Sequence, residues 1–340
     1  MVNIQKSIKE INSIEKQGSV ISLYCGYGAN TIGYKLAGLN VKVAVDKNGL
    51  CQKVYTKNHP DTVFILKDIR NIKGEELLSY AGLDKYELDI LDASPPSDLT
   101  AKPARITDNQ RDDNDFIEIG RIIEETMPKV FIINHHKKLL TGKTRLYLNE
   151  ILELYEEIGY RISLETLDAS VYEVPQKRER AIIIGVRKDL NIKPVYPEAL
   201  EKTITTKEAI EDLIDRGLEG KIKSKRDFYI KEYFRPGCTS KEVKEIAKIH
   251  NINVRGANYK RDRWDSVYYE LMPHTTRPYH PKVDRVLSIW EALRLQTFPD
   301  DYSLSGYKHK DWKNVCKSIP PNLIKHIANT IKLEILEKLF

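Results

Sequence analysis

The chain has no apolar run close to the roughly 20 residues that a helix needs to cross a bilayer, which excludes a membrane-spanning protein. Residues 1–19 also lack the apolar core of a signal peptide. The four cysteines show no paired spacing, and the adjacent His135 and His136 have no third ligand at suitable spacing, so neither disulfides nor a metal site is expected. These absences predict a globular protein of the reducing cytoplasm that has no membrane partner.

The net charge of +6 is mild and by itself indicates no partner. Basic and aromatic residues interleave in 221–235 and again in 259–264, where Lys260, Arg261 and Arg263 lie. This composition suits the phosphate backbone of a nucleic acid, but a solvated basic face has the same composition. Charge alone therefore leaves both interpretations open.

Short β-branched runs alternate with amphipathic stretches over the first half of the chain. The expected strands are 19–25, 41–46, 62–66, 86–94, 130–133 and 181–187. The expected helices are 30–39, 50–58, one with Phe116, Ile119, Ile122 and Ile123 on one face, and 145–159. This alternation predicts an α/β fold with a doubly wound, mostly parallel sheet.

From about 190 the alternation fails, and a helical pattern resumes only after 282. We therefore expect residues 18–190 to form one domain, 191–281 a second and smaller one, and 282–340 to return to the first. In the last segment, apolar residues spaced as on a helix form one stripe. They are Ile324, Ile327, Ile331 and Ile335.

Glycines and acids punctuate the first strands in a pattern that suits a nucleotide. Gly26, Gly28 and Gly33 follow the first strand and permit a tight turn and close backbone approach. Asp46 ends the second strand, where a carboxylate can accept from ribose hydroxyls, and Asp68 ends the third, where it can accept from an adenine amino group. With no Gly-Lys-Ser/Thr sequence for a P-loop, the pattern favours an adenosine-type cofactor.

Successive segments, in order along nearly the whole chain, resemble motifs of the DNA cytosine-C5 methyltransferase family. They are LYCGYGANTIGYKLAG, AVDKN, KDIRNI, ASPPS, MPKVFIINHH, VPQKRERAIIIGVR, HPKVDRVLSIWEALRLQTFPDDY and NVCKSIPPNLIKHIANTI. The resemblance implies the class I methyltransferase fold with S-adenosyl-L-methionine as cofactor. It also implies that 191–281 is a DNA-recognition domain and that a cytosine is flipped out of double-stranded DNA. The residues it implies for cofactor binding are Tyr24, Gly26, Gly28, Asp46, Lys47, Asp68 and Ile69.

The chain departs from the family at the residues on which C5 chemistry depends. Ser97 stands where the family has its nucleophilic cysteine, and Asn134 where it has a glutamate. Methylation at C5 needs a thiolate that adds to C6 while the glutamate keeps N3 protonated. A serine alkoxide is essentially unpopulated at neutral pH, and an asparagine cannot supply the proton. The family route to C5 is therefore disfavoured.

Direct transfer to the exocyclic N4 amine needs no covalent intermediate. Ser94, Pro95, Pro96 and Ser97 are similar to the Ser/Asn/Asp-Pro-Pro-aromatic motif of amino-methylating enzymes, except that Ser97 is not aromatic. Tyr27 or His135 would then have to stack on the base. We therefore predict methyl transfer to N4 rather than C5.

The resemblance also implies roles outside this motif. The loop 97–115 would close over the flipped nucleotide, and Arg178 and Arg180, with Gln176, would contact the base or nearby phosphates. The predicted catalytic residues are Ser94, Pro95, Pro96, Ser97, Asn134, Arg178 and Arg180. A catalytically inactive DNA-binding homologue and a tRNA cytosine methyltransferase remain alternatives. We expect a monomer, with a cognate restriction endonuclease as a candidate partner.

Overall fold

The computed structural model describes residues 6–96, 115–214, 228–229, 232–238, 240–252, 261–273 and 278–339. By contacts, the chain divides into two units. The sheet unit comprises 8–168, 179–199 and 319–340, and the second unit comprises 1–7, 169–178 and 200–318. The domain boundaries expected from the sequence stay a prediction. Over these described ranges, every helix is too short or too polar to cross a membrane.

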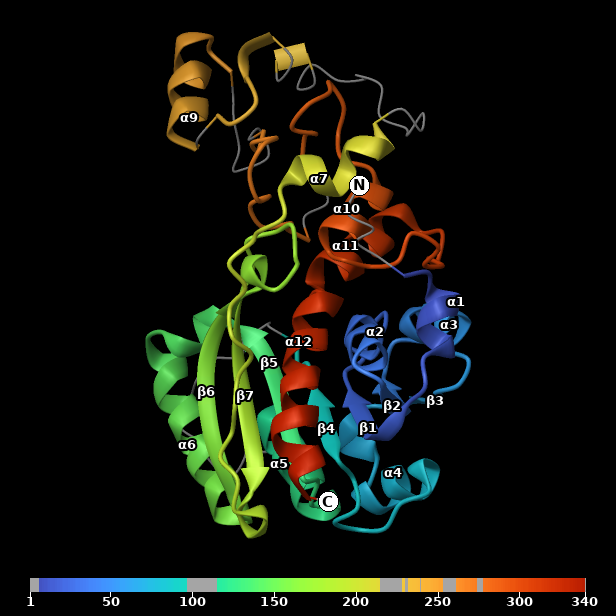
Figure 1. Cartoon of the computed structure of the whole chain (residues 1–340). Helices are drawn as coiled ribbons and strands as arrows, with labels where there is room; N and C mark the ends of the chain where they lie inside the picture. Colours follow the sequence, from blue (N-terminus) through green and yellow to red (C-terminus); the bar gives the residue numbers. More distant parts are fainter. Residues whose placement is uncertain are drawn as a thin grey trace. The chain divides into compact units, whose positions relative to one another are not determined.

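A seven-stranded sheet with the order β3-β2-β1-β4-β5-β7-β6 forms the centre of the sheet unit (Figure 1). Its strands are β1 (Gln17–Leu23), β2 (Leu39–Asp46), β3 (Val63–Leu66), β4 (Ile90–Ala93), β5 (Val130–His136), β6 (Tyr160–Asp168) and β7 (Glu179–Arg187). All pairs among β1 to β5 are parallel, whereas β7 runs antiparallel to both of its neighbours. The predicted mostly parallel α/β fold is confirmed.

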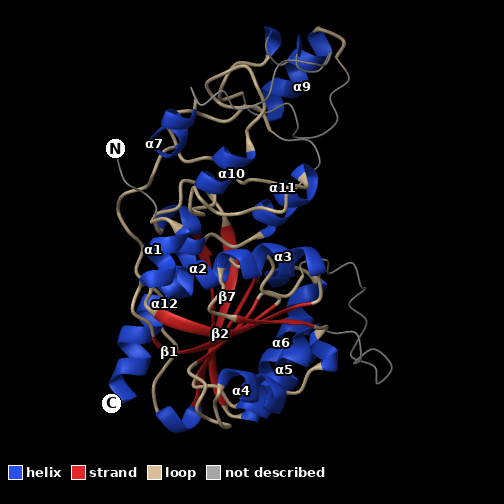
Figure 2. Ribbon diagram, turned by 90° about the vertical axis from the view of Figure 1, so that its right-hand side faces the viewer, coloured by secondary structure: helices blue, strands red, loops and turns tan. Residues whose placement is uncertain are grey.

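Helices cover both faces of this sheet (Figure 2). The helices of the sheet unit are α1 (Ile8–Ser13), α2 (Ala29–Leu36), α3 (Gly49–Asn58), α4 (Gly74–Ala81), α5 (Asp115–Thr126), α6 (Lys143–Ile158) and α12 (Pro321–Ile331). On one face, the apolar sides of α4, α5 and α6 pack on the sheet in a single core cluster. On the other face, α12 packs against α2. Because both faces are covered, the buried parts of the central strands are mostly apolar.

The predicted apolar stripes lie where the sequence pattern placed them. Phe116 and its three isoleucine partners on α5 are buried, and so is the C-terminal stripe from Ile324 to Ile335. Pro321 begins α12 at the position where proline is best tolerated, and the helix continues as a π-helical turn over Lys332–Leu336. The sequence pattern did not predict α4 or β6.

The second unit contains short helices joined by irregular segments. Its helices are α7 (Thr206–Ile210), α9 (Ser240–Ile249), α10 (Ile289–Leu295) and α11 (Lys308–Lys317). A capping box starts α10, in which Ser288 and Glu291 each bond the other's backbone N–H. A small core of Phe234, Cys238, Val243, Ala247, Ile252 and Tyr279 supports α9.

Candidate active site

The turn between β1 and α2 has the left-handed backbone that its glycines permit. Gly26 and Gly28 have φ of 53° and 85°, and Tyr24 adopts φ of 55° although it carries a side chain. A Cβ at Gly28 would come within 2.6 Å of His59 Nε2, so only glycine fits there. Gly33, by contrast, lies inside α2 and serves helix packing, not the turn.

Asp46, at the end of β2, holds this turn. Its Oδ2 accepts from the Gly26 backbone N–H at 3.0 Å, and its Oδ1 accepts from the Asn48 N–H at 2.8 Å. Burial raises the pKa of Asp46, and these N–H bonds only partly offset the effect. A carboxylate has about four acceptor sites, so Asp46 keeps the acceptor capacity that a ribose hydroxyl requires.

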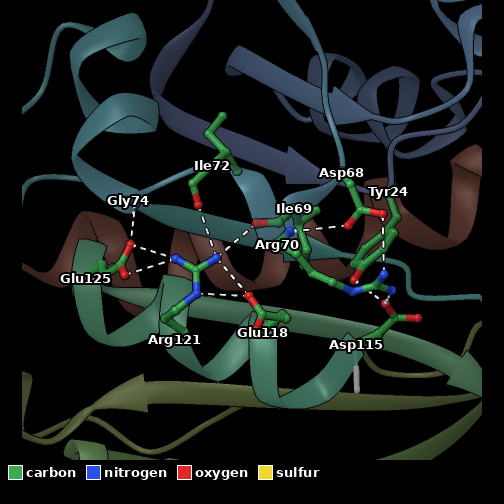
Figure 3. Close-up of polar contacts among 10 residues, drawn as sticks. All are labelled: Tyr24, Asp68, Ile69, Arg70, Ile72, Gly74, Asp115, Glu118, Arg121 and Glu125. Atoms are coloured by element: carbon green, nitrogen blue, oxygen red, sulfur yellow. Dashed lines mark hydrogen bonds and ion pairs between the residues drawn. The ribbon is translucent and has the colours of Figure 1, made fainter. Parts of the chain in front are cut away.

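A polar network crosses the ends of β1 and β3 (Figure 3). Tyr24 Oη donates to Asp115 Oδ1 at 2.9 Å, and Arg70 lies between Asp115, at 3.4 Å, and Asp68, at 3.5 Å. Lys47 Nζ donates to Asp68 at 2.9 Å. Desolvation tends to raise the pKa of Asp68, but these cations outweigh it and the pKa is lowered. Three predicted cofactor residues thus lie in one network, together with two residues that sequence reasoning missed.

Ile69, another predicted cofactor residue, is held through its backbone. Its carbonyl accepts from Arg121 Nη2 at 2.9 Å, and the Ile72 carbonyl accepts from the same nitrogen at 3.1 Å (Figure 3). Arg121 on α5 also pairs with Glu118 and Glu125. The guanidinium group therefore ties the turn after β3 to α5.

Ser94 and Asn134 come together at the ends of β4 and β5. Ser94 Oγ accepts from Asn30 Nδ2 at 3.0 Å and also from Asn134 Nδ2. Because a hydroxyl oxygen has two lone pairs, both are then occupied, and the hydroxyl proton is left to donate. Pro95 is buried and Pro96 is exposed. Ser97 and most of the predicted loop 97–115 lie outside the described residues.

Behind Ser94, Asp92 is completely buried in β4. It accepts from Ser22 Oγ at 2.8 Å, from Asn30 Nδ2 at 2.9 and 3.0 Å, and from Tyr34 Oη at 3.1 Å. Burial raises the pKa of Asp92 to about 6, against the opposing effect of these donors. The only sign of Asp92 in the sequence is an acidic residue inside an apolar strand. That sign does not indicate which residues donate hydrogen bonds to it.

All four cysteines of the chain lie among the described residues and are buried. Burial raises the pKa of Cys25, and it raises the pKa values of Cys51 and Cys316 to about 12. Cys238 is fully enclosed in the small core of the second unit. No cysteine of this chain therefore offers the exposed thiolate that a nucleophile at C6 requires.

The two predicted arginines belong to different units. Arg178, in the second unit, is 2% exposed, pairs with Glu270 at 3.2 Å and donates to the Cys316 carbonyl at 2.7 Å. Arg180 lies on β7 and donates to the Glu179 carbonyl at 2.7 Å. Contact of either arginine with a base or phosphate stays a prediction.

Tyr27 and His135, the predicted stacking residues, are 1% and 3% exposed. His135 packs beside Phe116 at 5.7 Å between ring centroids, and burial lowers its pKa, so the ring is neutral at pH 7. Across the ranges that the structure describes, His, Cys, Asp and Glu side chains form no group of three or more suited to a metal ion.

A mostly parallel sheet with a glycine turn after β1 and acids at the ends of β2 and β3 is the arrangement typical of α/β proteins that bind nucleoside cofactors. Residues 18–333 match the family model for C-5 cytosine-specific DNA methylases. The chain therefore belongs to the C-5 cytosine-specific DNA methylase family. The predicted family and enzyme class, a DNA cytosine methyltransferase, are confirmed.

Curated relatives and solved structures agree with this assignment. Type II methyltransferase M.XorII of Xanthomonas oryzae pv. oryzae is 27% identical, and the match covers 94% of this chain and 85% of the relative. Type II methyltransferase M.FnuDI of Fusobacterium nucleatum is 28% identical, and the match covers 94% of this chain and 95% of the relative. A candidate DNA modification methyltransferase from an E. coli prophage shares the fold, with a TM-score of 0.71 and 21% identity over 94% of this chain and 100% of that one. Spodoptera frugiperda DNMT2 also shares the fold, with a TM-score of 0.66 and 15% identity. This match covers 91% of this chain and 98% of the DNMT2 chain.

Proposed function

We propose that this protein transfers a methyl group from S-adenosyl-L-methionine to the exocyclic N4 of a cytosine flipped out of double-stranded DNA. The observation that carries the choice of N4 is the burial of every cysteine in a chain that has Ser97 after its Pro-Pro pair. Without a thiolate, addition to C6 has no suitable nucleophile, whereas transfer to an amine needs none.

The residues at the ends of β1 to β3 fit this cofactor. The left-handed turn at Gly26 and Gly28 would let a ligand approach the backbone closely, and Asp46 keeps acceptor capacity for ribose hydroxyls. When bound, S-adenosylmethionine supplies an electrophilic methyl group on a sulfonium, which leaves as a neutral thioether. Tyr24, Lys47, Asp68 and Ile69 complete the proposed cofactor site.

Asn134 would orient the amine, and Ser94 would hold the Asn134 side chain in place. The Asn134 amide nitrogen is engaged by Ser94 Oγ, which leaves Asn134 Oδ1 to accept a hydrogen from N4. The Pro95 carbonyl, next along the chain, is the second candidate acceptor. Two acceptors on the N4 hydrogens would turn the nitrogen lone pair toward the methyl group, and the proton released after transfer would go to water.

We further propose that the protein acts as a monomer on duplex DNA. Its relatives are named Type II methyltransferases, so a cognate restriction endonuclease is the corresponding candidate partner. In this proposal Ser97 acts at the flipped base, and Arg178 and Arg180 contact the base or the phosphates around it.

Mass spectrometry of nucleosides from DNA of cells that express the protein tests the target atom. We expect N4-methylcytosine, with Ser94→Ala lowering the rate about 10²–10³-fold and Ser97→Ala much less. A product of 5-methylcytosine, or a denaturation-resistant adduct with 5-fluorocytosine DNA, would overturn the choice of N4. Neither product, with cofactor and DNA binding intact, would support the inactive homologue, and the same assay on tRNA tests that substrate.

Calorimetry with S-adenosylmethionine tests the cofactor independently of turnover. Asp46→Ala should weaken binding by roughly 1–3 kcal/mol, because it removes the acceptor for ribose and frees the Gly26 turn. Asp46→Asn is the matched control, since it keeps one acceptor oxygen and should lose less. No binding by the unmutated protein would contradict the proposed activity altogether.

A further inference from the structure

The side chain of Asn30 joins two loops of the candidate active site. Asn30 is the second residue of α2 and follows the glycine turn by two positions. Its Nδ2 donates to both carboxylate oxygens of Asp92, at 2.9 and 3.0 Å, and to Ser94 Oγ at 3.0 Å. One amide group therefore connects the end of the cofactor turn with the residue before Pro95.

The connection continues to β5. Ser94 Oγ also accepts from Asn134 Nδ2, so Asp92, Asn30, Ser94 and Asn134 form one hydrogen-bonded series, which we name the Asn30 chain. Asp92, Asn30 and Asn134 are 0%, 6% and 7% exposed. Ser22 and Tyr34 donate to Asp92 from the other side and fix its carboxylate.

The Asn30 chain has a defined direction. An ionised carboxylate can only accept hydrogen bonds, so Asn30 must turn its NH₂ group toward Asp92 and, with its second hydrogen, toward Ser94. Ser94 Oγ is then an acceptor, and the Asn134 NH₂ group points to it. As a result, Asn134 Oδ1 and the Ser94 hydroxyl proton are the polar groups of this series that the described residues leave for a ligand.

We propose that Asn30 is a positioning residue that couples the cofactor turn to the Ser94-Pro95-Pro96 segment and sets which atom Asn134 presents to the base. The inference rests on the proposed function, because it treats the ends of β4 and β5 as the base site. An acceptor at Asn134 Oδ1 selects a base with an exocyclic amine over one with a carbonyl there. Methyl transfer requires donor and acceptor to align closely, and a shift of about 1 Å can cost on the order of 10²-fold in rate.

Two variants separate positioning from simple structural support. Asn30→Ala removes the connection. The exchange Asn30→Asp with Asp92→Asn keeps an amide–carboxylate pair inside the fold but turns an acceptor, not a donor, toward Ser94. Asn58→Ala is the matched control, since Asn58 is a buried amide of the same unit, 2% exposed, that donates to Val54 within its own helix.

The measurements are thermal unfolding, single-turnover methylation and the coupling between two ligands. Coupling is the ratio of duplex affinities with and without S-adenosylhomocysteine, and it needs no turnover. For Asn30→Ala we expect a rate lower by about 10²-fold and a coupling ratio near one. For the exchange we expect the melting temperature to recover while rate and coupling stay low, and for Asn58→Ala we expect unchanged coupling.

Two outcomes would overturn the inference. One is a coupling ratio in Asn30→Ala equal to that of the unmutated protein. The other is an exchange variant that recovers rate, coupling and melting temperature together, since Asn30 would then only support the fold. A product other than N4-methylcytosine would contradict the proposed function instead, and it would leave the coupling measurement to decide the role of Asn30.

Discussion

At the scale of single residues, Asp92 shows how burial changes an ordinary carboxyl group. Among the described residues, its partners are two hydroxyls and an amide, none of them a cation. Burial therefore outweighs hydrogen bonding, and its pKa rises from 3.8 to about 6. The group is ionised at neutral pH, but at a cost in folding free energy.

This cost predicts a pH dependence. Between about pH 4 and 6 the unfolded chain releases the Asp92 proton while the folded chain keeps it, so stability falls as pH rises. The difference in pKa corresponds to roughly 3 kcal/mol. Urea unfolding of Asp92→Asn and the unmutated protein should therefore show the variant gaining that much in relative stability between pH 4 and pH 7.

Comparison with the uncharged isostere cancels the titration of all other groups. A difference in unfolding free energy that stays constant from pH 4 to 7 would contradict the raised pKa of Asp92. A difference that changes in the opposite direction would mean that the donors around Asp92 outweigh its burial.

At the residue level, a motif names a residue but not its contacts. Ser94 and Asn134 stand at motif positions that follow or end adjacent strands, but the sequence analysis did not predict the hydrogen bond between them. The pairing of Asn30 with Asp92 was not predicted either, because a polar residue inside an apolar pattern does not reveal which partner, 62 residues away, will satisfy it.

At the scale of elements, the close packing of α2 on α12 depends on Gly33. A Cβ at this position would lie 2.5 Å from Ile324 Cβ and 2.6 Å from the Pro321 carbonyl oxygen. The latter contact is with backbone and cannot be relieved by a side-chain rotation. The contact with α12 therefore requires a glycine at this position of α2.

We predict that Gly33→Ala destabilises the protein by about 1–3 kcal/mol through overpacking, despite alanine's higher helix propensity. Gly49→Ala, in the first turn of α3, is the control, because a Cβ there meets no atom within 4 Å. It should stabilise by about 0.4–1 kcal/mol. Chemical unfolding of both variants checks this, and equal effects would show that propensity, not packing, decides at Gly33.

The sequence pattern predicted the central strands better than the sheet edge. β1, β2 and β5 each contain a run of mostly apolar buried residues, and that pattern is local. β6 carries partly exposed residues along most of its length, so it has no continuous apolar run to detect. The antiparallel direction of β7 follows from its pairing with β5 and β6, which no local pattern specifies.

At the scale of the whole molecule, the basic residues proposed for DNA differ in their availability. Arg261 is 4% exposed and pairs with Asp284 at 3.1 Å, so it supports the second unit and is not free for a phosphate. Arg263 is exposed, and Lys260 lies outside the described residues. Of the three residues, Arg263 is therefore the one whose substitution best tests DNA binding.

Arg263→Ala should reduce the slope of log affinity against log salt by about 1, because one phosphate contact and its released counterion are lost. Fluorescence anisotropy with a labelled duplex, measured over a range of salt concentrations, checks this. Lys85→Ala is the control, since Lys85 is exposed and precedes the start of β4, whereas Ser94 follows the end of that strand. Equal slopes for Arg263→Ala and the unmutated protein would place the DNA surface elsewhere.

The sequence by itself determined the family, the mostly parallel sheet and the glycine turn with Asp46, because these depend on local patterns and on residue types at fixed spacing. Only the tertiary structure decided the burial of all four thiols, the ion pair that occupies Arg261 and the hydrogen-bond direction at Ser94. Each of these depends on which distant residues meet in the fold and on how much water they exclude. Burial and pairing of that kind decide whether a polar group is available for chemistry, and sequence spacing does not record them.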